Sequence, residues 1–171
     1  FGRHDYVLAR HGIDVIGVDY VAENIRVAID GIKSGSTVRF IEGDCRFIEL
    51  GKFDAAICLY DVIGSYVRLE DNQKILDNIA RHLKRNGIAI ISVMNFDLTN
   101  KNAVYRFSFA DEPNKLLELN PSTIMEHTGD VFQGNYMMVD EQEHVIYRRE
   151  QFTEGSNLPK ELLVRDRRFT G

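Results

Sequence analysis

The chain has 171 residues, of which 44% are hydrophobic and 27% charged, as in an ordinary globular domain with a small appendage. Its formal net charge of -5 argues against a general nucleic-acid binder, because non-specific affinity for a polyanion comes from clustered lysine and arginine. No run approaches the ~18 apolar residues of a membrane helix. Cys45 and Cys58 lack the spacing of a disulfide framework or a zinc site, so we expect no metal and a reducing, cytoplasmic location.

The first half of the sequence alternates helical and strand patterns. Residues 3–12 predict a helix, and residues 13–18 predict an almost continuously apolar strand of the type that is covered on both faces. A second helix is expected after Asp19. Further strands are predicted at residues 37–41, 53–60 and 88–93. This alternation predicts an α/β fold with a doubly wound, Rossmann-like parallel sheet.

An amphipathic helix is expected between the last two of these strands. Its apolar stripe comprises Ile75, Leu76, Ile79, Ala80 and Leu83. We expect Asp71 to cap its N-terminus and Asn86-Gly87 to stop it. His82 is expected on its solvated surface.

The pattern changes after Phe96. Residues 97–120 are polar with scattered aromatics and predict one or two short helices around Pro113. Period-two alternation then predicts an antiparallel meander of strands at residues 131–139, 143–152 and 161–169, with turns at Asp140-Glu141 and Gly155-Ser156-Asn157. We therefore expect a cofactor-binding core at residues 1–96. Residues 97–171 are expected to form a helical linker and a small antiparallel β insertion, acting as a lid or substrate-binding region.

Acidic residues stand at the ends of three predicted strands: Asp19, Asp44 and Asp61. An open parallel sheet binds its ligand beyond the carboxyl ends of its strands, where a carboxylate can accept from ribose hydroxyls or the adenine amine. Gly2 lies seventeen residues before Asp19, close to the ~20 residues between a glycine loop and a ribose-binding acid. The pattern predicts a nucleoside site. Two structural alternatives stay open: Asp19 as a helix cap and Asp44 as a turn acid.

Three short motifs resemble those of class I S-adenosylmethionine-dependent methyltransferases of the small-molecule type: Phe1-Gly2-Arg3-His4, Gly43-Asp44-Cys45 and Leu59-Tyr60-Asp61. The resemblance implies S-adenosylmethionine as cofactor and methyl transfer to a small-molecule acceptor. It implies that Asp19 binds the ribose hydroxyls, while the Asp44 carboxylate and the Cys45 backbone N–H hold the adenine. The cofactor-binding residues that it implies are Gly2, Asp19, Tyr20, Asp44, Cys45, Tyr60 and Asp61.

The resemblance covers residues 1–96, without the family's first strand and its C-terminal strands. In a doubly wound sheet the first strand is central, so its absence leaves two inner edges unpaired. We therefore expect the chain to be a fragment of a longer one and to bind cofactor poorly as it stands.

The catalytic base is not identified by the sequence. Candidates are Tyr66, His127 and His144, since a histidine titrates nearest neutral pH; a surface histidine without a catalytic task is the alternative for each of the latter two. Further residues on the acceptor side are Ser65, Asn95 and Tyr136. Two other functions stay open, an NAD(P)-dependent Rossmann oxidoreductase and a catalytically silent nucleoside-binding or interaction domain. The sequence does not identify the methyl acceptor or the oligomeric state.

Overall fold

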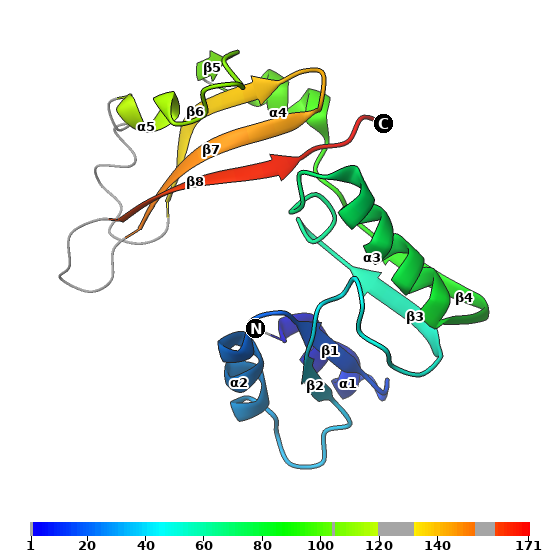
Figure 1. The fold of residues 1–171 in the computed structure, drawn as a ribbon. Coiled ribbons are helices and arrows are strands. Elements are labelled where there is room, and N and C mark those ends of the chain that lie inside the picture. The colour runs from blue at the N-terminus through cyan, green and yellow to red at the C-terminus, as the bar shows by residue number, and fades with distance from the viewer. Residues whose placement is uncertain (1, 104, 120–131, 153–159) are drawn as a thin grey trace. The chain divides into compact units, whose positions relative to one another are not determined.

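A computed structural model describes residues 2–103, 105–119, 132–152 and 160–171 (Figure 1). The chain divides into two compact units. The first comprises Phe1–Ala56 and Gln73–Ile88, and the second comprises Ile57–Asn72 and Ala89–Gly171. In this division the segment from Ile57 to Asn72 groups with the C-terminal sheet.

The first unit begins with two helix-strand pairs. Helix α1 (Arg3–Arg10) precedes strand β1 (Ile16–Asp19), and helix α2 (Ala22–Asp30) precedes strand β2 (Arg39–Glu42). The two strands are parallel, with Asp19 opposite Glu42. This arrangement confirms the predicted strand-helix-strand unit, although both strands are shorter than expected.

The buried apolar side chains of this segment are Ile25 and Ala28 of α2 and Val38, which immediately precedes β2. The apolar strand at residues 13–18 is less covered than predicted, since Ile13 is 48% exposed and Val18 36% exposed. A strand needs neighbours on both faces to bury every side chain, and the exposure of Ile13 and Val18 shows that this strand is not covered in that way.

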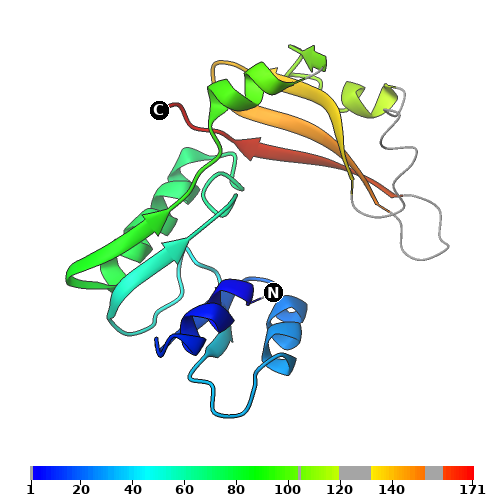
Figure 2. The same ribbon diagram turned by 180° about the vertical axis from the view of Figure 1, so that it is seen from behind.

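A third strand, helix and fourth strand follow as β3 (Phe53–Cys58), α3 (Leu69–His82) and β4 (Leu83–Ile91). The two strands pair with one another, and Figure 2 shows their arrowheads at the same end. Two boundary predictions are wrong. Helix α3 begins before Asp71, which lies in its acidic first turn, and it ends at His82, so Asn86 and Gly87 lie within β4.

The strand pairs β1-β2 and β3-β4 are separate two-stranded sheets among the described residues. Each of these four strands therefore has one edge without a partner strand among the described residues. The apolar residues of β4 are correspondingly uncovered, with Ile88, Ile90 and Ile91 all exposed. None of the described helices has the length and apolar character needed to cross a membrane.

The second unit contains a four-stranded sheet in the order β5-β6-β7-β8. Helix α4 (Phe96–Asn102) leads into β5 (Tyr105–Phe107) and the short helix α5 (Lys115–Glu118). The strands β6 (Phe132–Asp140), β7 (Val145–Phe152) and β8 (Lys160–Arg167) form the predicted antiparallel meander. Strand β5 pairs in parallel with β6 and was not predicted.

The core of this unit lies where α4 packs on the sheet. Phe96 contacts Val139 and Ile146, and Met137 packs against them. The turn predicted at Asp140-Glu141 is confirmed, because the Asp140 carboxylate accepts from the N–H groups of Gln142 and Glu143. Residue 131 and the turn predicted at residues 155–157 lie outside the described residues.

Candidate functional site

Asp19 stands at the carboxyl end of β1 and already makes two local hydrogen bonds. Its Oδ1 accepts from the Val21 N–H at 2.8 Å, and its Oδ2 accepts from the Asn24 amide at 3.1 Å. These bonds shape the entry to α2, as expected if the residue also serves as a helix cap. The Asp19 backbone oxygen accepts from the Gly43 N–H at 2.9 Å. Asp19 and the Gly43-Asp44-Cys45 turn therefore lie at one sheet edge.

Asp44 is engaged by its neighbour Arg46. Oδ1 accepts from the Arg46 backbone N–H at 2.9 Å and from Nε at 3.0 Å, while Oδ2 accepts from Nη2 at 2.6 Å. This pair is partly buried, and the Arg46 guanidinium holds the pKa of the Asp44 carboxyl below its usual range. Burial, with the adjacent Asp44 charge, raises the pKa of the Cys45 thiol. The turn-acid role of Asp44 is thus realised in this structure.

Gly2 and Tyr20 occupy contrasting positions. Gly2 is the N-cap of α1 with φ at 67°, in the left-handed region that glycine favours. Tyr20, immediately after Asp19, is 71% exposed. Neither makes a contact that assigns it to a ligand.

The loop after β3 belongs to the second unit and begins with a strained residue. Tyr60 has φ at 64°, which is uncommon for a residue with a side chain, and it is 59% exposed. Its N–H donates to Ser92 Oγ at 2.7 Å, and the Ser92 N–H donates to the Cys58 backbone oxygen. Ser92, which sequence reasoning missed, therefore stabilises the conformation that turns the loop away from the strand.

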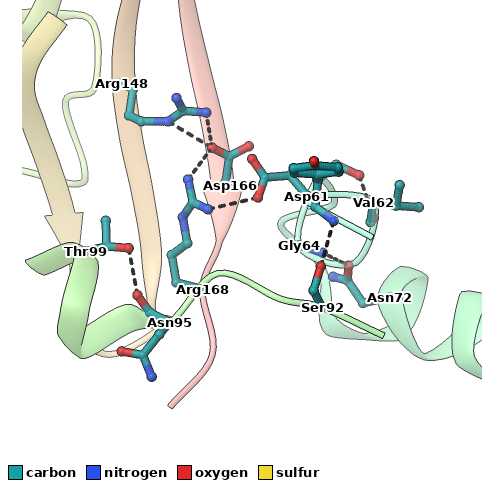
Figure 3. Close-up of polar contacts among 12 residues, drawn as sticks. Asp61, Val62, Gly64, Asn72, Ser92, Asn95, Thr99, Arg148, Asp166 and Arg168 are labelled. Atoms are coloured by element: carbon teal, nitrogen blue, oxygen red, sulfur yellow. Dashed lines mark hydrogen bonds and ion pairs between the residues drawn. The ribbon is translucent and has the colours of Figure 1, made fainter. Parts of the chain in front are cut away.

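Asp61 is held by Arg168, as Figure 3 shows. Arg168 Nη1 donates to Asp61 Oδ1 at 3.2 Å, and its Nη2 donates to Asp166 Oδ2 at 3.1 Å. Arg148 also donates to Asp166, from Nε at 3.0 Å, and to Glu150 from Nη1 at 2.9 Å. These alternating charges form an ion chain, defined as Glu150, Arg148, Asp166, Arg168 and Asp61.

A second attachment of the same loop is made by Asn72 of α3. Asn72 is 1% exposed; its Oδ1 accepts from the Gly64 N–H at 2.7 Å, and its amide donates to the backbone oxygens of Tyr66 and Arg68. The Gly64 backbone oxygen accepts from the Arg167 N–H at 2.7 Å. Asn72 lies three residues before Ile75 on the buried stripe of α3, so a polar residue in an apolar stripe was the signal available in the sequence.

The predicted bases are placed less favourably. His144 stacks on Phe96 with ring centroids 4.4 Å apart, and its backbone oxygen accepts from the Arg168 N–H. Asn95 caps α4, accepting from the Leu98 N–H at 2.7 Å. Tyr66 is partly buried within the loop, and His127 lies outside the described residues. Within the described part of the chain, no group of three or more histidine, cysteine or acidic residues is placed to hold a metal ion.

Comparisons with known proteins identify the family. A family model described as methyltransferase domain matches residues 1–87. The chain belongs to this family. Ubiquinone biosynthesis O-methyltransferase from Rickettsia prowazekii (strain Madrid E) is 34% identical over 90 residues, which are 52% of this chain and 34% of that protein. Glycine/sarcosine N-methyltransferase from Halorhodospira halochloris is 30% identical over 100 residues, 56% of this chain and 37% of that protein.

Solved methyltransferase structures share the fold. The CcbJ methyltransferase from Streptomyces caelestis has a TM-score of 0.71 at 11% identity, with 99% of this chain and 63% of that chain covered. An S-adenosylmethionine-dependent methyltransferase from Clostridium acetobutylicum has a TM-score of 0.65 at 16% identity, covering 97% and 62%. The Rossmann-like α/β prediction is confirmed. The chain matches about a third of the curated relatives' length and under two thirds of these structures.

Proposed function

We propose that this chain carries the cofactor-binding part of an enzyme that transfers a methyl group from S-adenosylmethionine to a small-molecule acceptor. The observation that carries the proposal is the meeting of Asp19 with the Gly43-Asp44-Cys45 turn at the carboxyl edge of β1 and β2, joined by the hydrogen bond from Gly43 to Asp19. The methyltransferase domain match over residues 1–87 supports the same reading.

Asp19 has the hydrogen-bonding capacity that a ribose requires. A carboxylate offers about four acceptor sites. Val21 donates one hydrogen bond to Oδ1 of Asp19, and Asn24 donates one to Oδ2. The remaining lone pairs of Asp19 can accept from two ribose hydroxyls while the cap is kept.

Asp44 fits adenine under one condition. Both of its oxygens are bonded to the Arg46 side chain, which supplies Nε and Nη2. An adenine amine must therefore replace one of these bonds, most readily the 3.1 Å bond from Nε to Oδ2. The backbone N–H of Arg46 keeps the carboxylate oriented during that exchange.

S-adenosylmethionine, when bound, supplies a methyl group on a sulfonium that a nucleophile attacks in line. The protein's task in such a reaction is alignment and exclusion of water. We assign alignment of the nucleoside to Asp19 and Asp44. The resemblance of the sequence motifs also makes Gly2, Tyr20, Cys45, Tyr60 and Asp61 our proposed cofactor-binding residues. We assign no catalytic base. The His144 ring is stacked on Phe96, and the Asn95 side chain caps α4.

The acceptor remains a small molecule without an assigned atom. Relatives named above are an O-methyltransferase and an N-methyltransferase, and a further structural neighbour is described as an amino pentose methyltransferase. The antiparallel sheet of the second unit is our proposed acceptor-binding region or lid. A cytoplasmic location is retained from the cysteine content alone.

Calorimetry on the full natural chain tests the proposal. Separate titrations with S-adenosylhomocysteine and with NAD distinguish the three functions left open by the sequence. We expect binding of S-adenosylhomocysteine and none of NAD. Binding of NAD alone would instead support an oxidoreductase, and binding of neither would support a silent domain.

A further inference from the structure

The ion chain leads from the interior of the antiparallel sheet to the loop after β3. Asp166, on β8, lies at its centre and receives both Arg148 and Arg168. The Arg168 side chain is 3% exposed and that of Asp166 8%, whereas the Asp61 side chain at the end of the chain is 44% exposed. The loop carboxylate is therefore fixed from behind by a buried cation and faces solvent on its other side.

Only an arginine can make both contacts at this position. Nη1 and Nη2 of Arg168 reach two different carboxylates, Asp61 and Asp166, at 3.2 Å and 3.1 Å. The planar guanidinium presents these donors in a fixed fork, while a lysine is a point charge on a flexible stem. Because Asp166 is also bonded to Arg148, the orientation of the Arg168 fork is set within the sheet.

The loop after β3 makes further hydrogen bonds to the end of β8. The Arg167 N–H donates to the Gly64 backbone oxygen, and Arg167 Nε donates to the Val67 backbone oxygen at 2.6 Å. A Cβ on Gly64, whose φ is 119°, would stand 2.6 Å from the Arg167 backbone oxygen. Two consecutive arginines thus hold the loop from Asp61 to Val67 against the last strand.

We propose that Arg168 is a positioning residue for the loop after β3, holding Asp61 in the orientation used in cofactor binding. This rests on the proposed function. Strand β8 belongs to the region that we assign to the acceptor. The Arg168–Asp61 ion pair therefore couples the position of β8 to the affinity for the cofactor. A movement of β8 would release Asp61, and cofactor binding would in turn favour the docked position of β8.

A double-mutant cycle with S-adenosylhomocysteine as the probe tests this role on the full natural chain. Calorimetry compares the wild type, Asp61→Asn, Arg168→Lys and the double variant. If Arg168 acts through Asp61, each single variant weakens binding by about fivefold or more, and the double variant binds no more weakly than the weaker single one. Arg149→Lys is the matched control, since Arg149 of β7 is also a buried arginine but pairs with Glu161 rather than with a member of the ion chain. We expect its affinity to stay within about twofold of the wild type.

Hydrogen exchange provides a second readout should Arg168→Lys fail to fold. The Ser65 N–H donates to the Asp61 backbone oxygen at 3.0 Å, so its protection reports on the loop. We expect Asp61→Asn to accelerate exchange at Ser65 by about tenfold and to leave Ile146 of the sheet unchanged. Unchanged exchange at Ser65, or additive losses of affinity in the cycle, would overturn the role of Arg168. Failure of the wild type to bind S-adenosylhomocysteine would overturn the proposed function itself.

Discussion

The ring of Phe40 on β2 lies directly against Gly17, its register partner on β1. A Cβ built on Gly17 would stand 2.6 Å from two carbons of that ring, closer than real contacts allow. The same ring meets the edge of Tyr6 at a centroid distance of 5.6 Å and would meet a Cβ on Gly2 at 2.6 Å. The absence of a side chain at Gly2 and Gly17 therefore leaves room for the Tyr6–Phe40 pair, which packs α1 against the strands.

Replacement of Gly17 by alanine should destabilise the first unit. The added methyl group must displace the Phe40 ring, and overpacking of this kind costs about 1–3 kcal/mol. Urea denaturation of Gly17→Ala measures the loss. Gly51→Ala is the control, because nothing lies within 4 Å of a Cβ at that position, and it should be neutral or stabilising within about 1 kcal/mol. Equal stability of the two variants would contradict the packing described.

Asn72 should contribute far more to stability than its neighbour on the same helix. Asn72→Ala leaves the Gly64 N–H and the backbone oxygens of Tyr66 and Arg68 without their partner, at a cost of about 2–4 kcal/mol. Gln73 makes one exposed hydrogen bond to Asp77, so Gln73→Ala should stay within about 0.5 kcal/mol of the wild type. Thermal unfolding of both variants checks the difference, and similar melting temperatures would refute it.

The strand-helix alternation and the meander could be predicted because they depend on local periodicity. Helix α3 was predicted by its apolar stripe, but its ends were not, since the boundaries of a helix are only weakly marked in a sequence. His82, predicted on the solvated surface, accepts from the Leu50 N–H at 2.8 Å through Nε2 and is partly buried. The contact spans 32 residues of sequence, so no local pattern reveals it.

The candidate site also combines features that the sequence predicts with contacts that it does not. Asp19 and the turn at Asp44 could be placed at one edge from strand order alone. The roles of Ser92, Arg168 and Asn72 could not, because each depends on which distant loop approaches it. Arg168 acts across 107 positions in the sequence, and only the return of β8 to the loop after β3 makes that contact.

The Asp44-Arg46 pair predicts a pH dependence. Arg46 lowers the pKa of Asp44 in the folded state, so the pair stabilises fully above the ordinary pKa of about 3.9, and that stabilisation is lost as the pH falls through the lowered value. In Arg46→Gln the Asp44 pKa should rise towards its ordinary value, measured by NMR of the side-chain carboxyl. Glu23 is the internal control, because Arg26 lowers its pKa independently and it should not move. An unchanged Asp44 pKa would exclude Arg46 as the cause.

Cys45 should react slowly with alkylating agents and become slower still with cofactor. Burial raises the pKa of its thiol, which leaves little reactive thiolate near neutral pH. In a Cys58→Ser variant of the full natural chain, we expect iodoacetamide to label Cys45 about tenfold more slowly than a free thiol. S-adenosylhomocysteine should slow the reaction further and NAD should not. If S-adenosylhomocysteine left the labelling rate of Cys45 unchanged, the assignment of Cys45 to the adenine site would be contradicted.

The affinity of Asp19→Asn for S-adenosylhomocysteine tests the central claim most directly. Asparagine preserves the shape of Asp19 but removes the charge that accepts from the ribose hydroxyls, and hydrogen bonds to charged groups contribute about 1.5–3 kcal/mol each. Glu42→Gln is the control, since Glu42 is the exposed register partner of Asp19 at the same sheet edge. We predict binding about 10- to 100-fold weaker in Asp19→Asn and unchanged in Glu42→Gln. An Asp19→Asn variant that binds S-adenosylhomocysteine as tightly as the wild type would contradict the assignment of this edge to the cofactor.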